Sequence, residues 1–383
     1  MMRASVQYLL SRDIGSGYCE TARIALEAAK RTGDARLVSQ ALFECARAAG
    51  EEGATDLFIA AEAGANELTA KVDPKAVPMA VLAKAYCRFL LGDPGEARIN
   101  LRNALQISQP NANAAELALI HSGLGISSYF LGDFEESYQE YLTALELTRR
   151  VGDDARLCTI AANLCGVLMN RGKYEEALRY GKLSVKHGEA CSSSYLLVAY
   201  TNLIDPYMLL GREAAAMDCL ERAKKWIEPD RRWRLRLQFL SEAASFALMQ
   251  RNVALAIDLI NQLEGVSKGR EIAIPMAGTY WKLRAFRMAT LGQLDAAYKM
   301  VSWKADSWKD SMVFGYLDMI ATKAWLEKLL EGRTNPETVS ELEIFGRLGA
   351  VGKRQLLVLQ GFLEASVDVR SSNTASSLKQ KMH

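Results

Sequence analysis

Apolar residues recur along most of this chain with the spacing of amphipathic α-helices. In one stretch, an apolar or small residue stands at Ala114, Leu117, Ala118, Leu124 and Gly125. That spacing places them on one face of a helix, which turns once every 3.6 residues or about 100° per residue. No segment shows the strict alternation of apolar and polar residues that marks a half-buried strand. The pattern therefore predicts an all-α protein.

The segments between the predicted helices repeat. Leu-Gly-Asp-Pro-Gly-Glu-Ala at residues 91–97 recurs as Leu-Gly-Asp-Phe-Glu-Glu-Ser at 131–137, as Arg-Gly-Lys-Tyr-Glu-Glu-Ala at 171–177, and as Leu-Gly-Arg-Glu-Ala-Ala-Ala at 210–216. Their glycines are 40, 40 and 39 residues apart. The same step leads to Gly17, Gly53, Arg251, Gly292 and Gly332, with arginine in place of glycine at position 251. The repeat predicts about nine units across nearly the whole chain.

Each unit is predicted to be a compact pair of helices joined by a glycine turn. Glycine adopts the left-handed conformation that ends the first helix, and an aromatic or aliphatic residue two positions later packs beneath the turn. A small residue five positions after the glycine, such as Ser137 or Ala177, allows the two helices to approach closely. Pro206 lies inside one predicted first helix and should kink it, because proline lacks the backbone donor.

These residues resemble the tetratricopeptide repeat. The L-G, G-x-Y, A, F and A-L positions of that pattern are matched by Leu124, Gly125, Gly132, Phe134, Ser137, Tyr141, Ala144 and Leu145. In the next unit Cys165 takes a glycine position. Because the step exceeds the standard repeat of about 34 residues, HEAT-type repeats stay open as an alternative. The long units look like those of bacterial maltose-regulator-type sensor arrays and of animal polarity scaffolds. The resemblance implies a right-handed superhelical solenoid of helix-turn-helix repeats.

The end of the chain differs from its middle. Residues 351–367 have the pattern of a last helix, which would cap the apolar face of the final repeat. The residues after it are polar and low in complexity, which is typical of a disordered tail. We therefore expect a repeat domain over residues 1–367 and a disordered tail over residues 368–383.

The composition argues against several classes of partner and chemistry. The chain has 47 Lys and Arg against 45 Asp and Glu, so no strong field favours nucleic acid or an anionic membrane. No apolar stretch is long enough to cross a bilayer, and we find no secretory signal, so the expected location is the cytoplasm. The seven cysteines are scattered and are expected to fill the core, and the three histidines share no metal-like spacing. Neither a metal nor a cofactor is expected.

The resemblance implies where a partner would bind. In tetratricopeptide proteins the first helix of each unit lines the concave surface, and positions two, five, six, nine and twelve of the repeat point into it. With the turn glycine as position fifteen, Asn163 and Asn202 fall at position six, Asp205 at position nine and Tyr129 at position twelve. Amide side chains donate and accept together, which suits recognition of a peptide backbone. The alternative is that each Asn bonds only a neighbouring helix or water.

A basic stretch is the second candidate site. It contains Arg231, Arg232 and Arg234 around Trp233. Such a stretch can contact phosphates and stack bases, or bind an acidic partner. The pattern fits better with a plain linker followed by an amphipathic helix, whose Trp233 and Leu237 face the core. The aromatic pairs Tyr280-Trp281 and Trp303 with Trp308 are likewise expected in the core.

No nucleophile, acid–base pair or metal set stands out, so we expect no enzyme. The paired carboxylates at residues 135–136 and 175–176 fall at the solvent-facing start of second helices, where they favour the helix dipole. The sequence predicts a scaffold or adaptor that binds a segment of another protein or a peptide. The alternative is a regulatory array that senses a small-molecule or peptide effector in bacterial signalling or transcription. The oligomeric state is not predicted.

Overall fold

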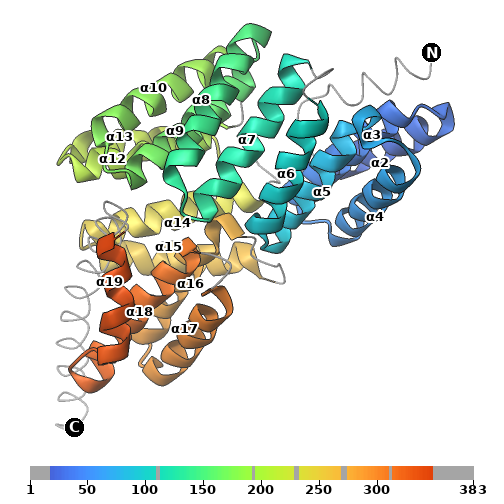
Figure 1. Ribbon diagram of the computed structural model, residues 1–383. Helices are drawn as coiled ribbons and strands as arrows, with labels where there is room; N and C mark the ends of the chain where they lie inside the picture. The colour runs from blue at the N-terminus through green and yellow to red at the C-terminus, as the bar shows by residue number, and fades with distance from the viewer. Residues whose placement is uncertain are drawn as a thin grey trace, which may run out of the picture. The chain divides into compact units, whose positions relative to one another are not determined.

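Helical hairpins make up the computed structural model of this chain, which describes residues 18–108, 113–191, 195–227, 233–268, 274–309 and 313–347 (Figure 1). Its α-helices are α2 (Tyr18–Thr32), α3 (Ala35–Glu52), α4 (Thr55–Lys71), α5 (Pro78–Leu91), α6 (Pro94–Ser108), α7 (Ala114–Phe130), α8 (Phe134–Val151), α9 (Asp154–Asn170), α10 (Tyr174–Ala190), α11 (Leu196–Thr201), α12 (Ile204–Leu209), α13 (Glu213–Lys224), α14 (Trp233–Met249), α15 (Val253–Ser267), α16 (Ile274–Thr290), α17 (Leu294–Trp308), α18 (Val313–Glu331) and α19 (Pro336–Arg347). A short 3-10 helix, η1 (Pro74–Ala76), precedes α5. These ranges contain no strand, and the all-α prediction is confirmed.

The chain packs into two compact units built from interleaved segments. The first unit comprises Met1–Leu164, Leu183–Tyr195 and Pro229–Arg234. The second comprises Cys165–Lys182, Leu196–Glu228 and Leu235–His383. Helices α9, α10 and α14 therefore contribute residues to both units. The predicted capping helix at residues 351–367 and the predicted tail at 368–383 lie outside the described residues.

A left-handed residue ends the first helix of each hairpin, as the repeat predicts. Seven turn glycines have φ between 70° and 102°, namely Gly53, Gly92, Gly132, Gly172, Gly211, Gly292 and Gly332. Arg251, which stands where the repeat lacks its glycine, has φ of 60°. A side chain in this region of backbone space carries strain. The hairpin geometry is thus kept even where the favoured residue is absent.

A small side chain stands where the two helices of a hairpin come closest. In six hairpins the position five residues after the turn is 0% exposed, and its occupants are Ala97, Ser137, Ala177, Ala216, Ala256 and Ala297. Ser137 also donates a hydrogen bond from Oγ to the carbonyl of Gly125, at 2.7 Å. The ring of Tyr141 presses on Gly125 so closely that a Cβ there would lie 2.9 Å from ring atoms. The close approach predicted from the repeat is confirmed for α7 and α8, whereas the hairpin of α3 and α4 has Phe58 at the position predicted to be small.

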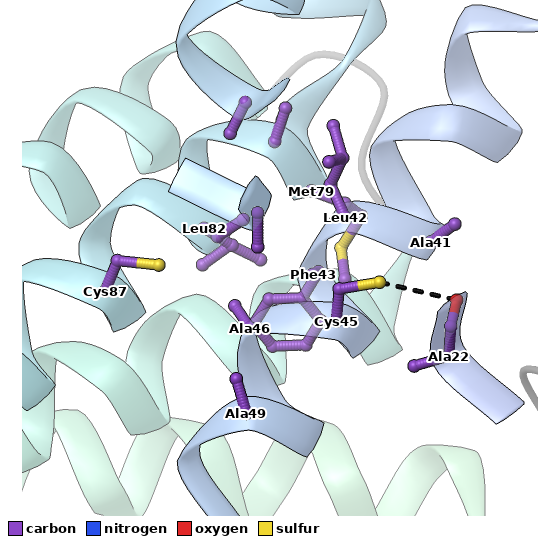
Figure 2. Packing of buried hydrophobic residues seen from close by; sticks show 14 of the residues in the cluster. Ala22, Ala41, Leu42, Phe43, Cys45, Ala46, Ala49, Met79, Leu82 and Cys87 are labelled. Atoms are coloured by element: carbon purple, nitrogen blue, oxygen red, sulfur yellow. Dashed lines mark hydrogen bonds between the residues drawn. The ribbon is translucent and has the colours of Figure 1, made fainter. Parts of the chain in front are cut away.

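The core of the first unit is made mainly of alanine, leucine and cysteine side chains. Figure 2 shows this packing around Leu42 and Cys45. The thiol of Cys45 donates a hydrogen bond to the carbonyl of Ala22 at 3.4 Å, which ties α3 to α2. Burial raises the pKa of Cys45 to about 12, so the thiol stays protonated and unreactive. Six cysteines are buried as expected, whereas Cys191 is exposed because it follows the end of α10.

One contact in the first unit joins residues far apart in the sequence. Trp233, the first residue of α14, is 5% exposed, and its Nε1 donates a hydrogen bond to the carbonyl of Glu52 at 3.3 Å. A Cβ on Gly53 would lie 3.1 Å from the same nitrogen, so this glycine permits both the turn and the contact. Leu237, one helical turn after Trp233, is 0% exposed. The burial of both residues matches the prediction of an amphipathic helix here.

Ion pairs join the second helices of neighbouring hairpins in the first unit. Arg98 of α6 pairs with Asp133 and, at 3.0 Å, with Glu136 of α8. Arg102 pairs with Glu136 as well, and Ser128 donates a hydrogen bond to it at 2.8 Å. Glu136 is therefore a half-buried link between helices, in addition to lying at a helix start. Burial raises its pKa, but Arg102 and Ser128 outweigh burial and hold the pKa below its ordinary value.

We expect Gly125→Ala to lower the free energy of unfolding by about 1–3 kcal/mol, because the added methyl group overlaps the buried ring of Tyr141. Gly265→Ala is the matched control. Gly265 lies within α15, and nothing stands within 4 Å of an added Cβ there, so alanine should raise stability by up to about 1 kcal/mol. Urea unfolding followed by circular dichroism measures both changes. Equal effects of the two substitutions would contradict the close helix approach.

We expect Glu136→Gln to reduce the sensitivity of the fold to acid. A carboxyl group whose pKa is lower in the folded than in the unfolded chain stabilises the fold while it is ionised. For Glu136 that contribution is present above about pH 4.5 and is lost as the pH falls through the lowered folded-state pKa. Thermal unfolding at pH 7 and near pH 3 measures the difference. Glu135→Gln, on the exposed side of α8, is the control, and a variant as acid-sensitive as the native chain would refute the link.

Candidate binding site

The four residues predicted to bind a partner lie on or beside first helices of hairpins. Tyr129 is in α7 and Asn163 is in α9. Asn202 lies between α11 and α12, and Asp205 is in α12. All four are half-buried, so each side chain both contacts the protein and reaches solvent.

Asn163 is engaged by a neighbouring helix. Its side chain forms a hydrogen bond with the hydroxyl of Tyr141 in α8. Tyr141 is 1% exposed, and burial raises the pKa of its phenol. The sequence left open the alternative that Asn163 bonds a neighbouring helix, and this hydrogen bond is of that kind. An amide group can make up to about four hydrogen bonds, so contact between Asn163 and a partner stays a prediction.

Pro206 divides the first helix of its hairpin, as its position predicts. Helix α11 ends at Thr201 and α12 begins at Ile204. Pro206 lacks the N–H group that would bond to the carbonyl of Asn202. The thiol of Cys165 donates to that carbonyl instead, at 3.3 Å. The cysteine at a glycine position of the repeat thus satisfies a backbone group that the proline leaves open.

The break brings Asn202 and Asp205 into one short segment beside Cys165. Burial, and then the carboxylate of Asp205, raises the pKa of the Cys165 thiol to about 12. The protonated thiol can therefore serve as a permanent donor at this place. Asn202 and Asp205 belong to the second unit and Asn163 to the first. Their convergence on one ligand stays a prediction.

Tyr129 belongs to an aromatic group at the turn between α7 and α8. Its ring centroid lies 5.3 Å from that of Phe130 and 5.9 Å from that of Phe134, both in edge-to-face geometry. Such pairs stabilise the arrangement beyond the burial of apolar surface. Phe134 is the aromatic residue two positions after Gly132, which the repeat predicted beneath the turn. Tyr129 therefore helps to hold its hairpin, and its role in binding stays a prediction.

Only part of the predicted basic stretch falls within the described residues. Arg231 and Arg232 lie outside them. The guanidinium group of Arg234 lies 5.3 Å from the ring centroid of Trp233, which is a cation–π contact. Because Trp233 is buried, this contact holds Arg234 against the protein. A contact between Arg234 and an acidic partner stays a prediction.

A polar cluster in the first unit was missed by the sequence analysis. In α3, Nη1 of Arg47 donates to both carboxylate oxygens of Glu44, at 3.2 and 3.1 Å. The hydroxyl of Tyr18 donates to the same carboxylate. With Gly53 as position fifteen, Glu44 and Arg47 fall at positions six and nine, so the register of the repeat would have found them. Both side chains are half-buried.

A second arginine lies near this cluster. Burial lowers the pKa of Arg156 in α9, and the charge of Arg47 lowers it further, against the effect of Asp153. Burial also lowers the pKa of Arg47, but Glu44 and nearby tyrosines outweigh it and raise the pKa. Arg156 pairs with Asp153 at 3.4 Å and donates a hydrogen bond to the carbonyl of Ala115 at 3.0 Å. Each arginine of this region therefore has its own carboxylate partner, and the charges of the cluster are balanced within the protein.

The described residues offer little support for other kinds of site. Among them, no three His, Cys, Asp or Glu side chains are placed to hold a metal ion. None of the helices in the described part of the chain combines the length and apolar character that crossing a membrane requires.

Solved structures share this fold, although no family model and no curated protein matches the sequence. A Rap protein complexed with competence and sporulation factor gives a TM-score of 0.68 at 12% identity, over 93% of this chain and 99% of that one. The apo form of RapI gives 0.54 at 12% identity, over 94% and 95% of the two chains. The apo quorum sensor NprR from B. thuringiensis gives 0.54 at 13% identity, over 94% and 98%. Together with the repeat, these likenesses confirm an all-α fold of the tetratricopeptide-like kind.

Proposed function

We propose that this protein binds a peptide, or a segment of another protein, on the face formed by the first helices of its hairpins. The observation that carries the proposal is the recurrence of polar pairs at positions six and nine of the repeat. Glu44 and Arg47 occupy these two positions in one unit, and Asn202 and Asp205 occupy them in another. Each of these side chains is half-buried in a chain whose first helices are otherwise rich in buried apolar residues.

The chemistry of these residues suits a peptide. The amide of Asn202 can donate to and accept from a partner's backbone. Asp205, in the same unit, can hold a cationic group. A donor, an acceptor and a negative charge are therefore available in one short segment of a first helix, which suits an extended polypeptide.

A regulatory role is a second form of this function, and the comparisons support it beside the scaffold. One structural neighbour is a Rap protein complexed with competence and sporulation factor, and another is described as a quorum sensor. These names belong to those proteins, and their identities to this chain are only 12% and 13%. The two structural neighbours support the alternative to a scaffold, which is a regulatory protein that senses an effector and alters an associated output. We place this activity in the cytoplasm, in signalling, without catalysis and without nucleic acid.

We expect alanine at Asn163, Asn202 and Asp205 together to weaken peptide binding roughly tenfold to several hundredfold. The reason is that each lost hydrogen bond contributes on the order of 1 kcal/mol, and more where a charge is involved. The probe is a peptide selected from a random display library against the native chain, and fluorescence anisotropy measures its dissociation constant. The double variant with alanine at Asn202 and Asp205 keeps the hydrogen bond between Asn163 and Tyr141, so any loss of binding in it does not come from the loss of that bond.

The control variant also replaces two asparagines and one aspartate by alanine, but on second helices. These residues are Asn66, Asn103 and Asp295, which are all exposed, and the variant should change binding less than about twofold. Circular dichroism establishes that each variant is folded. Normal binding by a folded double variant would refute the assignment of this face. A library that yields no peptide for the native chain would refute peptide binding itself.

A further inference from the structure

Three tryptophans and two cationic side chains gather on α16 and α17 in the second unit. Nζ of Lys304 lies 4.6 Å from the ring centroid of Trp281, 4.5 Å from that of Trp303 and 5.4 Å from that of Trp308. The guanidinium carbon of Arg284 lies 5.1 Å from the ring centroid of Trp281. We call these five residues the tryptophan cluster. It holds half of the six tryptophans in the chain.

The tryptophan cluster is a surface feature. Trp303 is 63% exposed, so the expectation that it lies in the core is wrong. The reason is its place on α17, whose buried face holds Val301 and Ala305. Trp303 stands two residues from each of them, about 200° around the helix. Tyr280 is 5% exposed and lies in the core as expected, whereas Trp281 and Trp308 are half-buried.

The cluster has the properties of a preorganised contact surface. Tryptophan is the residue that most often dominates the energy of a protein interface. An ammonium group held among three indole rings has already lost part of its rotamer freedom, so ordering it on binding takes little further entropy. Trp303 thus offers an apolar surface, with an ordered positive charge beside it.

The charges around the cluster decide which partner fits. Arg284 pairs with Glu264 at 3.7 Å. An incoming cation would meet Lys304 and Arg284 at the indole faces, which they already occupy. A nucleic acid or an anionic bilayer binds through many phosphates and needs a field of one sign. Here Asp295 and Asp306 are exposed on the same helix, which opposes such a field. A single carboxylate needs only one ammonium group.

We propose that the tryptophan cluster docks a short segment of a partner protein in which an acidic residue adjoins an aromatic or aliphatic one. The carboxylate pairs with Nζ of Lys304, and the apolar side chain covers the indole of Trp303. Both residues lie on α17, the second helix of its hairpin. Trp281 and Arg284 belong to the first helix, α16, but with Gly292 as position fifteen they fall at positions four and seven of the repeat. The surface therefore shares no residue with positions six and nine, on which the proposed function rests.

The test uses the full chain and a fluorescein-labelled twelve-residue peptide of repeated Asp-Phe-Glu-Leu. The comparison probes are the same peptide with Lys in place of every Asp and Glu, which we call the lysine peptide, an oligothymidylate, and vesicles of anionic phospholipid. Anisotropy measures the labelled peptides and oligonucleotide, and co-sedimentation measures the vesicles. We expect the acidic peptide to bind most tightly, and its binding to weaken roughly tenfold or more in Trp303→Ala.

Reversing the charge at Lys304 gives a second test, which does not depend on the loss of a side chain. Lys304→Glu should weaken binding of the acidic peptide and strengthen binding of the lysine peptide. The matched controls are Leu291→Ala, a 58% exposed leucine at the turn of the same hairpin, and Lys328→Ala, an exposed lysine of α18. Each should change binding less than about twofold. Circular dichroism confirms that the variants are folded.

The variant with alanine at Asn202 and Asp205 should bind the acidic peptide as the native chain does, which separates this surface from the first-helix face. Unchanged binding by Trp303→Ala, or no change of preference in Lys304→Glu, would overturn the proposal. So would tighter binding of the lysine peptide, the oligonucleotide or the vesicles than of the acidic peptide.

Discussion

Everything else in this structure depends on how closely two helices can cross within a hairpin. The crossing point holds alanine or serine at 0% exposure in hairpin after hairpin, and in one of them the facing position is Gly125, against which a tyrosine ring packs directly. Interhelical distance is set by the side chains at the contact. Larger residues there would spread the helices and weaken the contacts along them, so the small positions fix the geometry of six hairpins, whereas the hairpin of α3 and α4 carries Phe58 at this position.

This constraint also determines where polar side chains can lie. Positions at the crossing must be small and buried, so polar groups are left to the rest of the first helices and to the outer side of the second ones. On the outer side they form ion pairs such as those of Glu136, which join hairpins. On the first helices they include Asn202, at the break between α11 and α12. Pro206 cannot donate to the carbonyl of Asn202, and the thiol of Cys165 donates to it instead. A residue that we propose to bind a partner is thus supported by the same repeat that limits where it can lie.

The sequence predicted the hairpins well because their signals are local. Turn residues, small residues and the proline break each act within a few positions, and even Arg251 keeps the left-handed turn. Contacts across the sequence were not predictable in this way. The bond of Asn163 to Tyr141 and the pairing of Tyr18 with Glu44 depend on how neighbouring helices rotate. Trp303 was misjudged because an apolar residue was assumed to be buried, although its angular position on α17 pointed to solvent.

The contact of Trp233 with Glu52 bears on how the protein is made. Repeat arrays usually form by contacts between neighbours, so each repeat can fold soon after it is synthesised. Here 181 residues separate the two partners. At a synthesis rate of about 5–20 residues per second, the turn at Gly53 waits roughly ten to forty seconds for the indole that covers it. The first unit therefore cannot be completed in step with translation, and the turn at Gly53 stays uncovered until α14 has been synthesised.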